Sequence, residues 1–394
     1  MAKNTKNLEV NKVALYSSSK QVEIPATDDA IENEQLKSFL TEKLKSALRA
    51  ENLLVITGAG SSVDSGGKTM TQLWDSISKD LSDFEAIQDL VSYSSERKEK
   101  KDLEHLLSVL QIEKQSLENK GTDNTAISGY IESIESKILS ECSFDLPADA
   151  PHEFFLRKLL KARKNIDPRI KIFTLNYDRS FETASDRIGA VLIDGFSFSQ
   201  KQVFNSNSFD LDLVYREKSR IHSEHSFYSK VVHLYKIHGS VTWSKSIEKP
   251  GIIQKEKDPV TDAKKSVLIY PNSSKFEKSY EMPFFEMVGR MQSSLRKENS
   301  TLLIIGYGFN DEHINRVLAE AIKGNANLEV FVIKPRIDFS HDVLTEYKTW
   351  IDSGLQDLHL IGLTFSQFTK TIPEVSFDDD YVREKMVGKS LNES

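Results

Sequence analysis

Residues 53–62 read LLVITGAGSS, an apolar run that ends in a glycine-rich turn. The apolar part, Leu53 to Thr57, predicts a short strand that is buried on both faces. Glycines directly after such a strand let the backbone approach a phosphate, and the amino terminus of a following helix attracts anions. The third glycine of a full dinucleotide fingerprint is replaced here by Val63. By itself, the stretch fits a generic tight turn as well as a nucleotide-binding site.

Apolar segments of the same kind recur along the chain, and helical patterns such as residues 311–323 lie between them. They are residues 170–175, 190–193, 231–237, 267–270, 301–305 and 328–333. Strands that are apolar throughout and alternate with helices are typical of a parallel sheet covered on both faces. The predicted fold class is therefore α/β, with a doubly wound, mostly parallel, Rossmann-like sheet.

Two of these segments end in polar side chains that could carry chemistry. Asn176 and Asp178 follow the segment 170–175, and His238 follows the segment 231–237. Ligands of open α/β sheets bind at the carboxyl ends of the strands, and the near-neutral titration of imidazole suits proton transfer. Structural roles fit these residues too: Asn176 could form a turn, Asp178 could cap the next helix, and His238 could be a buried core histidine.

The segment 301–305 leads into a second glycine turn. Gly306 and Gly308 are placed where a ribose or an adenine could lie against the backbone. Asp311 then precedes a helical pattern, and we expect it to cap that helix.

Sequence patterning divides the chain into three parts. Residues 1–30 are polar and lack a periodic pattern, which predicts a flexible arm. Residues 31–373 hold the predicted sheet domain, interrupted at about 75–168 by a stretch whose leucines and isoleucines recur at helical spacing. We expect this stretch to be a helical insertion. Residues 374–394 are expected to form a loosely held acidic tail.

Charge and cysteine content exclude several classes of protein. The 52 basic and 59 acidic side chains give a net charge of −7, which argues against nucleic-acid or anionic-membrane binding. Cys142 is the only cysteine, so one chain cannot form a disulfide, a four-cysteine zinc ribbon or an iron–sulfur cluster. The sequence shows neither a signal peptide nor a run of about eighteen apolar residues. We expect a soluble, cytoplasmic protein, and no spacing of histidines and carboxylates predicts a metal site.

The four strand ends, GAGSS, TLNYD, IHG and IGYGF in that order, resemble the sirtuin family over roughly residues 50–335. In sirtuins the first loop holds the pyrophosphate of NAD, the asparagine lines the nicotinamide ribose pocket, and the histidine is the catalytic base. The resemblance implies these roles for the matching residues: pyrophosphate contacts for Gly58, Ala59, Gly60 and Ser61, the ribose and nicotinamide pocket for Asn176 and Asp178, the base for His238, and adenosine contacts for Gly306 and Gly308. Tyr307 stands where the family usually has a serine.

Two departures separate the chain from protein-deacylating sirtuins. It lacks the two cysteine pairs of their zinc ribbon, and residues 65–70 read SGGKTM where those enzymes carry a Gly-Ile-Pro-x-Phe-Arg motif. A chain that keeps the NAD loop, the asparagine and the histidine, with a helical insertion in place of the zinc module, looks like the sirtuin-like NAD hydrolases of bacterial antiphage defence. Its length and domain content are similar to the subunit that pairs with HerA-type hexameric ATPases.

The resemblance implies an NAD glycohydrolase that cleaves NAD to nicotinamide and ADP-ribose without a metal. Control by self-assembly into a homo-oligomer, or by a partner such as a HerA-type ATPase, is expected with it. Two other functions stay open: an NAD-dependent protein deacylase or ADP-ribosyltransferase, and a non-catalytic scaffold that senses NAD or ADP-ribose. The sequence gives no indication of the acceptor groove that a deacylase or transferase needs.

Overall fold

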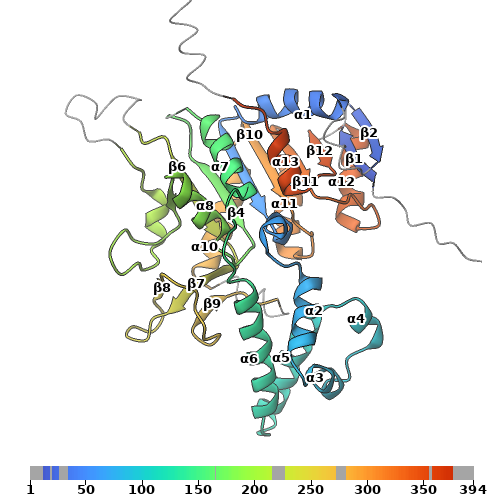
Figure 1. Cartoon of the computed structure of the whole chain (residues 1–394), viewed down its shortest axis with the longest axis vertical. Helices are drawn as coiled ribbons and strands as arrows, with labels where there is room; N and C mark the ends of the chain where they lie inside the picture. The colour runs from blue at the N-terminus through green and yellow to red at the C-terminus, as the bar shows by residue number, and fades with distance from the viewer. Residues whose placement is uncertain are drawn as a thin grey trace, which may run out of the picture.

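The computed structural model describes residues 12–17, 20–25, 34–164, 166–214, 227–271, 281–354 and 357–375. Within these ranges the central feature is a nine-stranded sheet (Figure 1). Its order is β2 (Lys20–Pro25), β1 (Lys12–Ser17), β12 (Leu358–Ile361), β11 (Leu328–Ile333), β10 (Ser300–Ile305), β3 (Asn52–Thr57), β4 (Ile170–Thr174), β6 (Val231–Lys236) and β5 (Val191–Ile193). The strands from β12 to β5 are parallel, while β1 and β2 run antiparallel to their neighbours. The predicted mostly parallel α/β fold is confirmed.

Helices cover both faces of the sheet because its strands are apolar on both faces. In β3, Leu53 and Val55 face one layer of helices, whereas Leu54 and Ile56 face the other. The first layer contains α1 (Glu34–Ala47), α7 (Pro151–Lys161), α8 (Ser180–Ile188) and α13 (Phe365–Thr371). The second contains α10 (Phe284–Leu295), α11 (Glu312–Gly324) and α12 (Asp342–Ser353). The expected double winding is thus present.

A separate helical body lies below the sheet in Figure 1. It comprises α2 (Met70–Asp80), α3 (Phe84–Leu90), α4 (Ser95–Glu99), α5 (Leu103–Asn119) and α6 (Thr125–Glu141). Apolar residues such as Leu106 and Ile134 give it a core of its own. The expected insertion extended to about residue 168, but α7 packs Phe155 and Leu156 into the core of the main sheet, so the separate body ends with α6. No helix of the described ranges is long and apolar enough to cross a bilayer.

A small antiparallel sheet of order β8 (Ile253–Lys255), β7 (Gly239–Lys245) and β9 (Ser266–Leu268) lies beside the helical body. The segment 267–270 was expected in the main sheet. This expectation is wrong because Gly239, at φ 88°, directs the chain after β6 into a new strand, β7, which pairs with β9. Val241 and Leu268 of this small sheet pack into the core of the helical body. The preceding connection holds a short turn of 3-10 helix, η4 (Ser206–Asp210).

The predicted flexible arm needs correction where the structure describes it. Residues 12–17 and 20–25 form β1 and β2, and β1 pairs with β12 at the edge of the sheet. Leu15 is fully buried in the core below that edge. The pairing partner lies at the other end of the chain, so local sequence gives no sign of it. Residues 1–11, 18–19 and 26–30 of the arm, and residues 376–394 of the expected tail, lie outside the described ranges.

Candidate active site

The carboxyl ends of β3, β4, β6 and β10 meet at one edge of the sheet around a cavity of about 360 Å³. This volume lies within the usual range for small-molecule sites. The chain leaves β3 for β4 on one side and later returns to β10 on the other, so the cavity sits at a topological switch point, where open α/β sheets bind ligands. The predicted site residues on its wall are Gly58, Ala59, Gly60, Asn176, Asp178, His238, Gly306 and Gly308.

The two glycine turns pack backbone against backbone. The amide of Gly60 donates to the carbonyl oxygen of Gly306 over 2.9 Å. A Cβ atom at Gly60 would lie 2.8 Å from the Cα of Gly306, and one at Gly306, whose φ is +62°, would lie 2.3 Å from the amide nitrogen of Ser61. Side chains are therefore excluded at both positions by the fold itself. This packing accounts for these glycines whether or not a phosphate binds beside them.

The turn after β3 does not open directly into an α-helix as the sequence predicted. Two turns of 3-10 helix follow, η2 (Ala59–Ser61) and η3 (Val63–Ser65), and α2 begins only at Met70. The amides of Gly60, Ser61 and Ser62 already donate to carbonyl oxygens within the protein. The expected helix amino terminus is displaced because Gly66, at φ 101°, interrupts the helical path. This loop therefore presents fewer free backbone amides to an anion than the start of an α-helix would.

Ser61 lies behind the cavity wall rather than on it. Its side chain is fully buried, and its Oγ donates to the carbonyl oxygen of Gly58 over 2.9 Å. The side chain amide of Asn176 lies 3.1 Å from that same carbonyl oxygen, 3.2 Å from Ser61 Oγ and 3.0 Å from Ser62 Oγ. Asn176 is therefore fixed against the first glycine turn. The sequence-based turn interpretation and the pocket interpretation of Asn176 both fit, because it belongs to the turn and lines the cavity.

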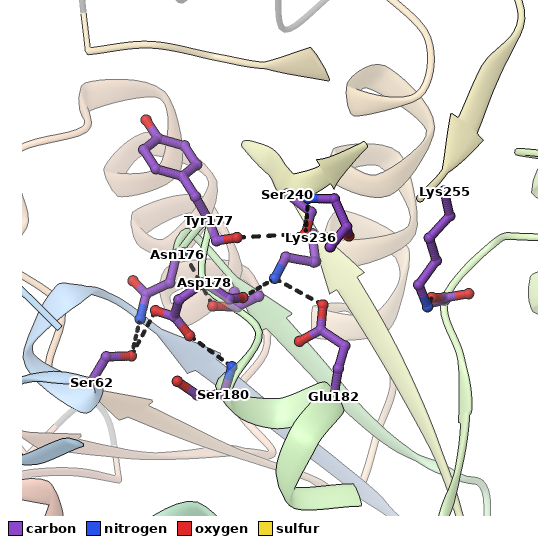
Figure 2. Close-up of polar contacts among 12 residues, drawn as sticks. Ser62, Asn176, Tyr177, Asp178, Ser180, Glu182, Lys236, Ser240 and Lys255 are labelled. Atoms are coloured by element: carbon purple, nitrogen blue, oxygen red, sulfur yellow. Dashed lines mark hydrogen bonds and ion pairs between the residues drawn. The ribbon is translucent and has the colours of Figure 1, made fainter. Parts of the chain in front are cut away.

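Asp178 is held from three directions, as Figure 2 shows. Its Oδ2 accepts from Ser62 Oγ over 2.8 Å, and its Oδ1 accepts from the amide of Ser180 over 2.9 Å, at the start of α8. Its carbonyl oxygen accepts from the ammonium of Lys236, which is only 2% exposed and pairs with Glu182 Oε1 at 3.0 Å. Through these two contacts, the Lys236 side chain of β6 holds the segment that follows β4. This ion pair was not predicted, because Lys236 ends an otherwise mostly apolar strand and Glu182 lies in a helix far from it in sequence.

His238 stands in the turn between β6 and β7. Its Nε2 lies 3.3 Å from Asp311 Oδ2, and the two side chains are 12% and 10% exposed. The next residue must be glycine, because a Cβ at Gly239 would lie 2.1 Å from the carbonyl oxygen of Val267. A carboxylate beside one ring nitrogen orients an imidazole and selects its tautomer. The pair is therefore competent to move a proton at the cavity wall.

Asp311 was predicted only as a helix cap, and this role is confirmed. Its Oδ1 accepts from the amides of His313 and Ile314 over 3.1 and 3.3 Å at the start of α11. Its contact with His238 was missed because the two residues are far apart in sequence. The available signal was the position of both residues at strand ends of one parallel sheet, since such ends share an edge.

The helical body closes one side of the cavity. Lys68, on the cavity wall, pairs with Glu141 Oε2 of α6 at 2.6 Å. Burial tends to raise the pKa of Glu141, but hydrogen bonds from Lys68, Ser76 and Lys137 outweigh it and hold this pKa at about 2. Burial raises the pKa of the Cys142 thiol to about 12, so this cavity-lining cysteine stays protonated and is a poor nucleophile.

Among the described residues, Glu329, Asp357 and His359 place possible metal-ligand atoms within 4.8 Å of one another. They lie at the amino ends of β11 and β12, at the sheet edge opposite the cavity. The ammonium of Lys43 lies 3.7 Å from both carboxylates and offsets part of their charge. We interpret this group as an ion-pair network between α1 and the sheet.

Comparison with known proteins gives one family match. Residues 170–356 match the family model described as the SIR2-like domain. The matched range includes Asn176, Asp178, His238, Gly306 and Gly308 and begins after the first glycine turn. This match supports a sirtuin-like family for the chain. No curated protein matches it.

Solved structures of Sir2 homologues resemble the chain at low identity. One is a mutant Sir2 homologue in complex with ADP-ribose, with 11% identity and a TM-score of 0.45 over 88% of this chain and 97% of that one. Another is a Sir2 homologue in complex with NAD, with 13% identity and a TM-score of 0.42 over 84% of this chain and 92% of that one.

Proposed function

We propose that this protein is an NAD glycohydrolase that cleaves NAD to nicotinamide and ADP-ribose. The observation that carries the proposal is that Asn176 and the His238–Asp311 pair line the same cavity as the two glycine turns. In this proposal the pyrophosphate binds beside the glycines and the reacting ribose beside the histidine, all of which line the cavity. The SIR2-like match over residues 170–356 supports NAD as the substrate.

Hydrolysis requires the bond between the ribose C1′ and the nicotinamide nitrogen to break, with both electrons leaving on nicotinamide. Positive charge then develops on the ribose, and a fixed polar pocket stabilises it. The side chain of Asn176 is held by the first glycine turn and is proposed to orient the ribose and the attacking water. Water adds its oxygen to C1′, and His238 accepts the released proton.

Asp311 is a positioning residue in this scheme. Its Oδ2 lies beside Nε2 of His238, so it favours the tautomer whose other nitrogen can accept a proton, and it stabilises the imidazolium that forms. Because Asp311 is anchored by the first amides of α11, the imidazole is fixed relative to the second glycine turn.

Nicotinamide release from purified protein tests the proposal against its alternatives. Release from NAD alone supports the hydrolase, release that requires an acetylated peptide supports the deacylase, and binding of NAD without release supports the sensing scaffold. His238→Ala should lower release by about 10²–10⁴-fold, the usual contribution of a general base. Wild-type rates in His238→Ala would remove His238 from the mechanism.

We further propose that the enzyme depletes NAD in bacterial antiphage defence, as a homo-oligomer or together with a HerA-type ATPase. Support comes from the order of the four motifs and from the helical body that stands in place of a zinc module. Measuring cellular NAD during phage infection, with and without His238→Ala and with and without a HerA-type ATPase, tests this role. NAD that stays constant during infection in every arm would contradict it.

A further inference from the structure

Two lysines line the cavity, and their surroundings differ. Lys68 is neutralised by Glu141 at 2.6 Å. The ammonium of Lys334 makes neither a hydrogen bond nor an ion pair with any residue of the described ranges, and lies 5.6 Å from the ring centroid of Phe309. Burial lowers the pKa of Lys334, and the distant carboxylate of Asp338 opposes this effect. A half-buried cation without a counter-charge is costly, and an anionic ligand would offset that cost.

Lys334 is joined to both glycine turns through the backbone. It follows β11 directly, and the carbonyl oxygen of the preceding Ile333 accepts from the amide of Gly306 over 2.9 Å. The carbonyl oxygen of Gly306 in turn accepts from the amide of Gly60 over 2.9 Å. These two hydrogen bonds link the carboxyl ends of β3, β10 and β11, and Lys334 is the first residue after β11.

The first glycine turn supplies little positive potential by itself. Its amides at Gly58, Gly60, Ser61 and Ser62 are used by internal hydrogen bonds, and α2 begins too late in the chain to direct its dipole there. The carboxylates of Glu104, Asp178 and Asp311 also line the cavity. A ligand with a pyrophosphate therefore needs a cation from another strand end, and Lys334 is the cavity lysine whose charge is not already paired with a carboxylate.

We propose that Lys334 binds a phosphate group of the dinucleotide substrate. This inference rests on the proposed function. Two phosphate groups of such a ligand have the required charge. One is the pyrophosphate, which NAD and NADP share, and the other is the 2′-phosphate, which only NADP carries. A lysine or arginine near the adenosine ribose is the usual means of accepting a 2′-phosphate in dinucleotide-binding sheets.

Titration calorimetry with two stable ligands tests the proposal. The ligands are ADP-ribose and its 2′-phosphate, which the enzyme would release from NAD and NADP and does not consume. Lys334→Gln removes the charge at similar length, and Lys334→Arg keeps it. Lys348→Gln is the matched control, because Lys348 also lies over a phenylalanine ring, that of Phe339, but belongs to the outer surface of α12. Thermal unfolding shows that each variant is folded.

Lys334→Gln should weaken binding by about 10- to 100-fold, the usual effect of losing a charged hydrogen bond, while Lys334→Arg and Lys348→Gln stay near wild type. Equal weakening for both ligands assigns Lys334 to the pyrophosphate, and weakening for the 2′-phosphate alone assigns it to NADP recognition. Binding of both ligands by folded Lys334→Gln within about twofold of wild type overturns the inference and leaves the proposed function intact. If the wild-type protein binds neither ligand, both proposals fail.

Discussion

Replacing Asp311 by asparagine tests whether a carboxylate beside His238 is needed for catalysis. The substitution keeps the size of the side chain and removes its charge. Asparagine is as good a helix cap as aspartate, so the hydrogen bonds to the first amides of α11 can be kept. The change therefore separates the catalytic contact from the structural one.

The expected loss follows from the geometry. At 3.3 Å, a carboxylate and an imidazolium attract each other by about 5 kcal/mol at an effective dielectric constant of about 20. The two side chains, Asp311 and His238, are 10% and 12% exposed, so screening by solvent is small. The single carbonyl oxygen of asparagine is used by the helix cap, as Oδ1 of Asp311 is, so the amide group faces His238 and does not replace the lost attraction. A loss of about 5 kcal/mol corresponds to a fall in kcat of about 10³–10⁴-fold.

The assay is nicotinamide release from NAD, with thermal unfolding measured on the same samples. Asp311→Asn should lose about 10³–10⁴-fold in kcat and change stability by less than about 0.5 kcal/mol, whereas Asp311→Ala should also lose about 1 kcal/mol of stability with the cap. Asp102→Asn is the matched control, since Asp102 caps α5 in the helical body. Hydrolysis by Asp311→Asn within about threefold of wild type would refute the positioning role.

Three further changes probe the rest of the site. Asn176→Ala should lower kcat by about 10²-fold in the nicotinamide assay because the ribose loses its fixed partner, and near-normal turnover would exclude Asn176 from the site. Gly60→Ala should cost about 1–3 kcal/mol in denaturant unfolding, since its Cβ would lie 2.8 Å from the Cα of Gly306; unchanged stability would show that the turns can separate. Glu141→Gln should reduce the loss of the free energy of unfolding that the wild type shows at acid pH. The pKa of Glu141 is lowered from 4.5 to about 2, so its contribution to stability is present above pH 4.5 and is lost as pH falls towards 2. Identical melting temperatures of variant and wild type from pH 5 down to pH 2 would contradict this.

Six of the parallel strands were predictable because each is mostly apolar, as burial on both faces requires. The other parallel strand, β12, was missed, because it is short and His359 interrupts its apolar residues. Residues 53–57 and 301–305 form neighbouring strands of the observed sheet, β3 and β10. The gathering of Asn176 and His238 at one cavity was also expected, because parallel strands present their carboxyl ends at a common edge. The small sheet was not, since a single glycine, Gly239, redirects the chain after β6.

The residues missed at the site share one property: each acts through a partner that is remote in sequence. Asp311 lies beside His238, Lys236 beside Glu182, and Lys68 beside Glu141. The pattern around each gives only a local role, such as a cap or a solvated charge. Which distant group it meets depends on strand order.

The amino-acid sequence by itself determined most of the parallel strands, their order of appearance and the polar residues at their ends, because hydrophobic periodicity and turn chemistry are local properties of the chain. Only the tertiary structure decided that β1 and β2 complete the sheet, that the glycine turns pack against each other, and which charges are paired. These outcomes depend on loop closure and on burial between distant segments, where a shift of one residue changes every contact.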